Sequence, residues 1–200
     1  MGKTVDYFIA PQSPWTYLGH ERFVAIARKH GAQVLLKPCD VNKVFAATGG
    51  VPVSQRPPQR QAYRLAELTR WSKHLGMPLT LHPKFFPVSG EMAAKMIIAA
   101  QHVAGTDKAL DLLGALGRAC WAEEKNLADA DTLLAVANGL GLDGAALLKL
   151  AEGDAVAADY ARNTDDAIAA NVFGVPWYRI EGDGFWGQDR LEFVEQALKG

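Results

Sequence analysis

The chain has 200 residues, enough for one sizeable hydrophobic core or for a small domain that carries an insertion. Its net charge is −1 at pH 7 and it has no dense block of Lys and Arg, so nucleic acids and anionic membranes are poor candidate partners. No apolar run approaches the roughly 20 residues of a membrane-spanning helix, and the N-terminus lacks the apolar core of a signal peptide. These features predict a cytoplasmic globular protein.

The first forty residues predict a strand, a helix and a second strand. Residues 4–9 (TVDYFI) are rich in β-branched and aromatic side chains, as buried strands are. Residues 14–30 have one apolar and one charged face, which indicates an amphipathic helix, and Gly31 follows where a helix C-terminus favours glycine. Residues 32–37 (AQVLLK) predict a strand that ends at Pro38. Such a unit normally forms a parallel pair with a right-handed crossover.

The centre of the chain is predicted to be helical. Residues 41–58 read as a loop, because Gly49-Gly50 and three prolines interrupt them. A proline-rich segment at 77–88 separates the first helix from the others, and no strand-like alternation occurs in this part. The predicted helices cover residues 59–75, 90–104, 106–125, 129–139, 143–152 and 154–171.

The C-terminal residues return to β structure. Residues 175–180 (VPWYRI) predict a strand, 181–184 (EGDG) a tight turn, and 185–186 the start of a returning strand. Residues 187–190 (GQDR) then lead into a final helix, in which Leu191, Val194, Ala197 and Leu198 share a face.

These patterns predict an α/β architecture with a discontinuous domain. Residues 1–40 and 170–200 would close into one small mixed sheet with its helices. Residues 41–169 would form a helical insertion beside it.

Ser13 stands at the start of the first predicted helix. Pro14 suits the first helical position, and the Ser13 hydroxyl can accept a hydrogen bond from a first-turn amide. The unpaired amides and positive partial charge of a helix N-terminus also favour an anion. Two interpretations stay open: Ser13 is a cap alone, or it presents its hydroxyl and the helix end to a thiolate or carboxylate.

Three motifs sharpen this picture: SPWTYLG at residues 13–19, NVFGVPWYRI at 171–180 and FWGQDRL at 185–191. The order of elements resembles thioredoxin with the helical insertion of DsbA-type oxidoreductases and kappa-class glutathione transferases. With the three motifs, essentially the whole chain resembles the 2-hydroxychromene-2-carboxylate isomerases, glutathione-dependent relatives of the kappa transferases. The resemblance implies a thioredoxin-like domain with a large all-helical insertion, and dimers are common among such relatives.

The resemblance also implies a glutathione site. Ser13 would hold the cofactor as a thiolate, and Val175, before a cis-proline, would pair with its cysteinyl part. Amides at the start of the last helix would take the γ-glutamyl carboxylate, and Asp189 its ammonium. The implied cofactor-binding residues are Ser13, Trp15, Val175, Pro176, Gln188, Asp189 and Arg190. On local grounds Pro176 can equally be an edge-strand proline, Asp189 a helix cap, and Arg190 a partner of a neighbouring side chain.

A second substrate, an aromatic carboxylate, would bind near the loop before the helical insertion. By the resemblance, Gln55 and Arg56 match positions near the aromatic acid, and Phe86 would line an apolar pocket. Arg60 and Arg64 are further candidates for the carboxylate, and a solvated surface charge is the alternative for each arginine. Relatives can have a tyrosine near Phe85-Phe86, so its absence here leaves the substrate's identity open.

Dithiol redox chemistry is excluded by the residues at the first helix. Ser-Pro-Trp-Thr stands at residues 13–16 where an oxidoreductase would carry C-x-x-C. Cys39 and Cys120 are far apart and read as small core residues, and the five histidines are scattered, so we expect no metal site.

The sequence therefore predicts a glutathione-dependent cis–trans isomerase that interconverts 2-hydroxychromene-2-carboxylate and trans-o-hydroxybenzylidenepyruvate. The alternatives are a kappa-like transferase that conjugates glutathione to electrophiles and a non-catalytic thioredoxin-like binding domain.

Overall fold

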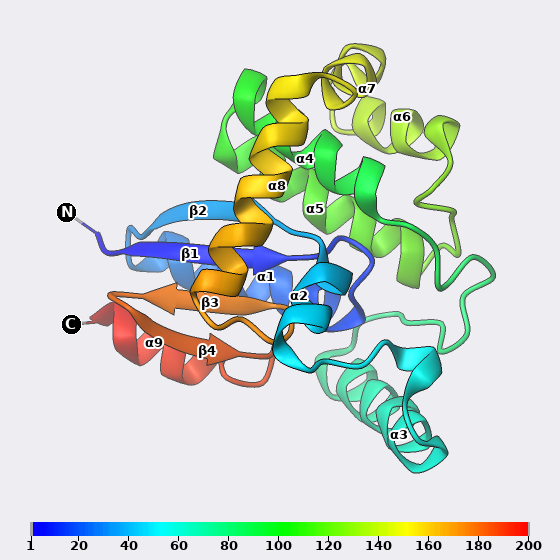
Figure 1. The fold of residues 1–200 in the computed structure, drawn as a ribbon, viewed down its shortest axis with the longest axis vertical. Helices are drawn as coiled ribbons and strands as arrows, with labels where there is room; N and C mark the ends of the chain where they lie inside the picture. Colours follow the sequence, from blue (N-terminus) through cyan, green and yellow to red (C-terminus); the bar gives the residue numbers. More distant parts are fainter. Residues whose placement is uncertain (1, 200) are drawn as a thin grey trace.

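A computed structural model describes residues 2–199 of the chain (Figure 1). Its strands are β1 (Thr4–Ile9), β2 (Gln33–Pro38), β3 (Trp177–Ile180) and β4 (Asp183–Trp186). A 3₁₀ turn, η1, covers Val53–Gln55. The α-helices are α1 (Pro14–Lys29), α2 (Val41–Thr48), α3 (Pro58–Leu75), α4 (Glu91–Ala104), α5 (Thr106–Trp121), α6 (Ala130–Gly139), α7 (Gly144–Ala151), α8 (Asp154–Ala169) and α9 (Leu191–Lys199).

The four strands form one mixed sheet in the order β2-β1-β3-β4. β1 pairs in parallel with β2 and antiparallel with β3, and β4 returns antiparallel to β3. In Figure 1, α8 crosses one face of this sheet, while α1 and α9 lie behind it. The expected α/β architecture, a thioredoxin-like sheet with a large helical insertion, is confirmed.

Alternation along β1 divides its side chains between two apolar clusters. Val5, Tyr7 and Ile9 belong to the larger cluster, which also contains buried side chains of α1, α9 and the helices α4 to α7. Phe8 belongs to the smaller cluster on the other face, with residues of α2 and α8. The helical insertion therefore shares one continuous core with the sheet.

Two local predictions were wrong. Residues 41–48 form α2 rather than a loop, because Asp40 caps the helix through Asn42 N and Lys43 N and the glycine pair merely ends it. β4 begins at Asp183, so the turn is only Glu181-Gly182, whose φ angles of 52° and 91° suit a two-residue hairpin.

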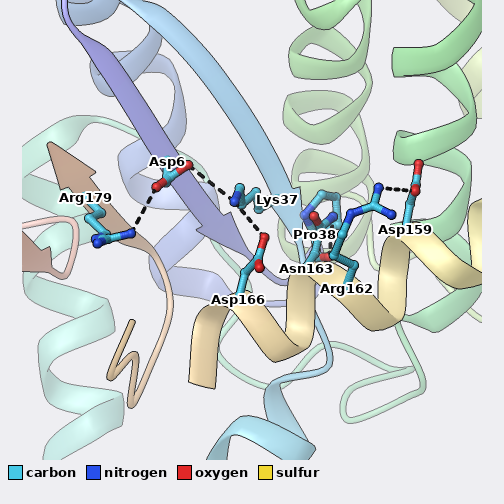
Figure 2. A network of polar contacts seen from close by, with 8 residues as sticks. All are labelled: Asp6, Lys37, Pro38, Asp159, Arg162, Asn163, Asp166 and Arg179. Atoms are coloured by element: carbon cyan, nitrogen blue, oxygen red, sulfur yellow. Dashed lines mark hydrogen bonds and ion pairs between the residues drawn. The ribbon is translucent and has the colours of Figure 1, made fainter. Parts of the chain in front are cut away.

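A network of charged side chains lies on the sheet face that α8 covers (Figure 2). Lys37 Nζ of β2 lies 3.4 Å from Asp6 Oδ1 of β1 and 2.8 Å from Asp166 Oδ2 of α8. Arg179 Nη1 of β3 lies 3.7 Å from Asp6 Oδ2. The side chains of Lys37 and Asp6 are each 19% exposed, so water and salt screen this pair less than a surface pair. The network ties three strands to α8.

Replacing Lys37 with methionine should therefore destabilise the protein. The change leaves Asp6 and Asp166 without their shared cation, and we expect the free energy of unfolding to fall by about 1–3 kcal/mol. Urea denaturation at pH 7 measures it. Lys43→Met is the matched control, because Lys43 is exposed on α2. A Lys37→Met protein as stable as the control would contradict the structural role of this network.

His20 of α1 is buried between the sheet and the helical insertion, with 5% of its surface exposed. Its Nε2 lies 2.9 Å from the carbonyl oxygen of Leu110 and its Nδ1 lies 3.3 Å from the Tyr7 hydroxyl. A neutral ring satisfies both contacts when Nε2–H donates to Leu110 and Nδ1 accepts from Tyr7. Burial lowers the pKa of His20 from 6.5 to about 4.

This lowered pKa makes stability depend on pH. Between pH 6.5 and 4 the unfolded chain binds a proton at His20 that the folded protein does not. The lowered pKa therefore contributes about 3 kcal/mol to the free energy of unfolding above pH 6.5. This contribution is lost as the pH falls from 6.5 toward 4. Urea denaturation from pH 7.5 to 4 should show this slope, His20→Gln should flatten it, and the exposed-site control His82→Gln should not. Equal slopes in the three proteins would contradict the assignment.

Candidate functional site

Two adjoining cavities open where the sheet meets the start of the helical insertion. The first, about 550 Å³, lies between the N-terminus of α1, α2 and the segments around Phe86 and Gly174; we call it the Ser13 compartment. The second, about 730 Å³, lies between α3 and residues 184–190; we call it the Asp189 compartment. Residues that line both are Trp15, Arg56, Arg60, Arg64, Val175 and Trp186.

Ser13 is the N-cap of α1. Its Oγ accepts a hydrogen bond from Thr16 N at 3.2 Å, and Pro14 occupies the first helical position. The cap uses a lone pair of the hydroxyl oxygen, so the hydroxyl hydrogen stays available for donation. The two interpretations of Ser13 are therefore compatible: the side chain can cap α1 and donate to an anion in the Ser13 compartment.

Val175 lies across the same compartment from another part of the chain. The Val175-Pro176 peptide bond is cis, as the resemblance implies. Pro176 does not line either cavity, but its carbonyl oxygen accepts from Gly187 N at 3.0 Å and so holds the chain beyond β4. The fold thus brings Ser13 and Val175 to one cavity.

Gln188, Asp189 and Arg190 form a turn that leads into α9, which begins at Leu191. Gln188 is buried, and Arg22 of α1 donates to its backbone oxygen at 3.0 Å and to its side-chain oxygen. Arg190 Nη1 lies 2.7 Å from Asp189 Oδ2, so Arg190 pairs locally. The Arg22 contacts fix the turn against α1, at one wall of the Asp189 compartment.

Of the residues predicted to bind the second substrate, the structure places some at the cavities and one outside them. Phe86 lines the Ser13 compartment and Arg56 lines both cavities, whereas Gln55 is exposed and lines neither. Arg60 and Arg64 of α3 also line both cavities. No carboxylate of residues 2–199 forms an ion pair with these three arginines.

Arg64 differs from its two neighbours in burial. Only 9% of its surface is exposed, and its Nη2 is buried without a hydrogen-bond partner among the described residues. Its Cζ lies 5.5 Å from the ring centre of Phe86 and 5.8 Å from that of Trp121. Burial, with a contribution from Arg56, lowers the pKa of Arg64 to about 10.

Parts of the site come from α2 and α5 and were not predicted from the sequence. Asn42 and Phe45 line the Ser13 compartment because residues 41–48 are helical. Trp121, at the end of α5, packs on Phe86 with ring centres 4.7 Å apart and donates from Nε1 to the Gln12 carbonyl oxygen at 3.3 Å. An apolar residue at a helix end carries no local signal that it backs a cavity.

Both cysteines are free and buried, and neither lines the two compartments. Burial raises the pKa of each thiol to about 12. Within residues 2–199 no group of three His, Cys, Asp or Glu side chains is placed to hold a metal ion. The same residues contain no helix with the length and apolarity required to cross a bilayer.

Comparison with known proteins identifies the class. The profile of the DsbA-like thioredoxin domain family matches residues 4–199, so the chain belongs to this family. The chain is 29% identical to a 2-hydroxychromene-2-carboxylate isomerase of Sphingobium xenophagum, over 99% of both chains. A solved structure of a 2-hydroxychromene-2-carboxylate isomerase superposes with a TM-score of 0.81 at 25% identity, over 98% of this chain and 94% of the other. Human glutathione S-transferase kappa 1 is 22% identical over 98% of this chain and 91% of its own.

The two cysteines should be unreactive in the folded protein. A thiol pKa of about 12 in place of 9 reduces the thiolate fraction roughly a thousandfold, and burial blocks access. Titration with 5,5′-dithiobis(2-nitrobenzoate) at pH 8 should detect almost no thiol before unfolding and two after it in guanidinium chloride. Rapid labelling of either cysteine in the native state would contradict this expectation.

Proposed function

We propose that this protein is a glutathione-dependent cis–trans isomerase that interconverts 2-hydroxychromene-2-carboxylate and trans-o-hydroxybenzylidenepyruvate. The names of its relatives favour an isomerase, and the similarity to kappa transferases favours glutathione. The observation that carries the proposal is Ser13: its hydroxyl oxygen caps α1 while its hydrogen stays free, in a cavity that Val175 also lines. Neither cysteine lines this cavity, which supports a reacting sulfur that a bound thiol supplies.

The residues of both compartments fit glutathione. Ser13 would donate to the cofactor's sulfur, and the N-terminus of α1 would lower the pKa of that thiol. Val175 would pair with the cysteinyl backbone, beside Trp15. Asp189 would accept from the γ-glutamyl ammonium, in a turn that Arg22 holds through Gln188.

When bound, glutathione supplies a thiolate that adds reversibly to the conjugated side chain of the substrate and so permits rotation about the former double bond. The protein's contribution is to hold the sulfur ionised and to hold the substrate against it. Phe86 and Arg56 would line the place of the second substrate, and Arg190 would act on Asp189 as its local partner. Gln55 lies outside both cavities and receives no role here.

A kappa-like transferase is the second candidate, because the chain is also similar to human glutathione S-transferase kappa 1. It would use the same Ser13 and Asp189. An aryl-halide conjugation assay separates the two activities, and a calorimetric titration with glutathione separates both from a non-catalytic binding domain, which would have no affinity.

Ser13→Ala should reduce glutathione-dependent isomerisation by about 100-fold to 1,000-fold, as loss of a donor to a developing or fixed anion commonly does. The assay follows the ultraviolet spectrum of 2-hydroxychromene-2-carboxylate with and without glutathione. Ser13→Asp separates donation from capping: aspartate caps a helix as well as serine does, but its charge repels a thiolate. It should keep the stability of the wild type and lose the activity.

Ser89→Ala is the control, since the exposed Ser89 caps no part of α1 and lines neither compartment. If the Ser13→Asp variant is active, Ser13 acts only as the cap of α1 and not as a donor to the thiolate. A wild-type protein with no glutathione-dependent spectral change would refute the proposed function itself.

A further inference from the structure

Arg64 carries a buried positive charge that no described residue balances. Its Nη2 lies out of contact with solvent and has no hydrogen-bond partner, and among residues 2–199 no carboxylate pairs with it. A buried charge without a partner costs several kcal/mol, so such a group is uncommon in a structure unless it serves a ligand. The neighbouring Arg56 adds a second positive charge and increases this cost.

The three arginines at the cavities are not equivalent. Arg56 already donates from Nε to the Val51 carbonyl oxygen at 2.7 Å, and Arg60 is exposed. The guanidinium of Arg64 lies beside the packed rings of Phe86 and Trp121, with its Cζ 5.5 Å and 5.8 Å from the two ring centres. Of the three, Arg64 is the one that is buried and has a buried guanidinium nitrogen without a partner among the described residues.

Trp121 also sets the position of Arg64 relative to Ser13. While one face of its ring contacts Arg64, its Nε1 donates to the carbonyl oxygen of Gln12, the residue before Ser13. Gln12 lines the same compartment, and its side-chain oxygen is buried beside Gly90 without a hydrogen-bond partner. Arg64 and the aromatic ring of Phe86 therefore line one cavity together with Ser13.

We infer that Arg64 binds the carboxylate of the second, aromatic substrate inside the Ser13 compartment, with the aromatic group against Phe86. A planar guanidinium matches a carboxylate with two parallel hydrogen bonds. This inference deepens the proposed function and rests on it for the identity of the substrate, and it moves the carboxylate contact from Arg56, where the resemblance places it, to Arg64.

Direct binding tests the inference without turnover. The probes are trans-2-hydroxycinnamate and its carboxamide, and the readout is quenching of tryptophan fluorescence. The wild type should bind the carboxylate about 10-fold to 100-fold more tightly than the amide, as expected for a hydrogen bond to a charged group. Arg64→Met should abolish this preference, Arg64→Lys should keep part of it, and Arg70→Met, on the exposed part of α3, should leave it unchanged.

Steady-state kinetics distinguishes two possible ligands of Arg64: the carboxylate of the aromatic substrate and the glycyl carboxylate of glutathione. Arg64→Met should raise KM for the chromene carboxylate about 10-fold to 100-fold and change the calorimetric affinity for glutathione by less than threefold. Loss of glutathione affinity with an unchanged substrate KM would assign Arg64 to the glycyl carboxylate and overturn the inference. A wild type without isomerase activity whose carboxylate preference still depends on Arg64 would refute the proposed function alone.

The stability of Arg64→Met gives an independent readout. Removing an unpaired buried charge should leave the melting temperature equal to or above that of the wild type, whereas loss of a structural arginine would lower it. Arg64→Lys retains the charge, so a change in carboxylate preference can be measured even if the methionine variant folds poorly. A lowered melting temperature together with an intact preference would overturn the inference.

Discussion

The pairing of β1 with β3 is the interaction on which the site depends. β1 lies in the interior of the sheet, and its register with β3 sets Phe8 opposite Trp177. The chain leaves β1 toward Ser13 and enters β3 from Val175, so the antiparallel pairing places both at the same end of the sheet. Residues from opposite ends of the sequence therefore meet at one cavity, and the helical insertion covers it from the side.

At this position the protein uses a hydroxyl where a redox protein of the same fold class would use a sulfur. A thiolate there would react by exchange, whereas a serine hydroxyl can only donate and accept hydrogen bonds. Because the cap on α1 occupies the oxygen and leaves the hydrogen, Ser13 stabilises the helix without giving up its donor. Stability and ligand binding do not compete at this residue.

At Arg64, by contrast, stability and ligand binding compete. Its burial without a partner destabilises the folded protein in the absence of a ligand, and the neighbouring rings of Phe86 and Trp121 reduce this cost without removing it. The Lys37 network on the sheet face that α8 covers shows the other arrangement, in which each charge has a partner within the fold. The charges of the Lys37 network stabilise the fold, whereas the charge of Arg64 is left for a ligand.

The sequence by itself determined the order of elements, the cap at Ser13 and the class of the fold, since these depend on residues near one another in the chain. It located α3 nearly to the residue, but it misread α2 because two glycines that end a helix look the same as two that prevent one. It also could not rank Arg56, Arg60 and Arg64, which follow one another at helical spacing with the same charge. Only the tertiary structure decided among them, because burial and the contact with Phe86 and Trp121 come from segments far away in the chain.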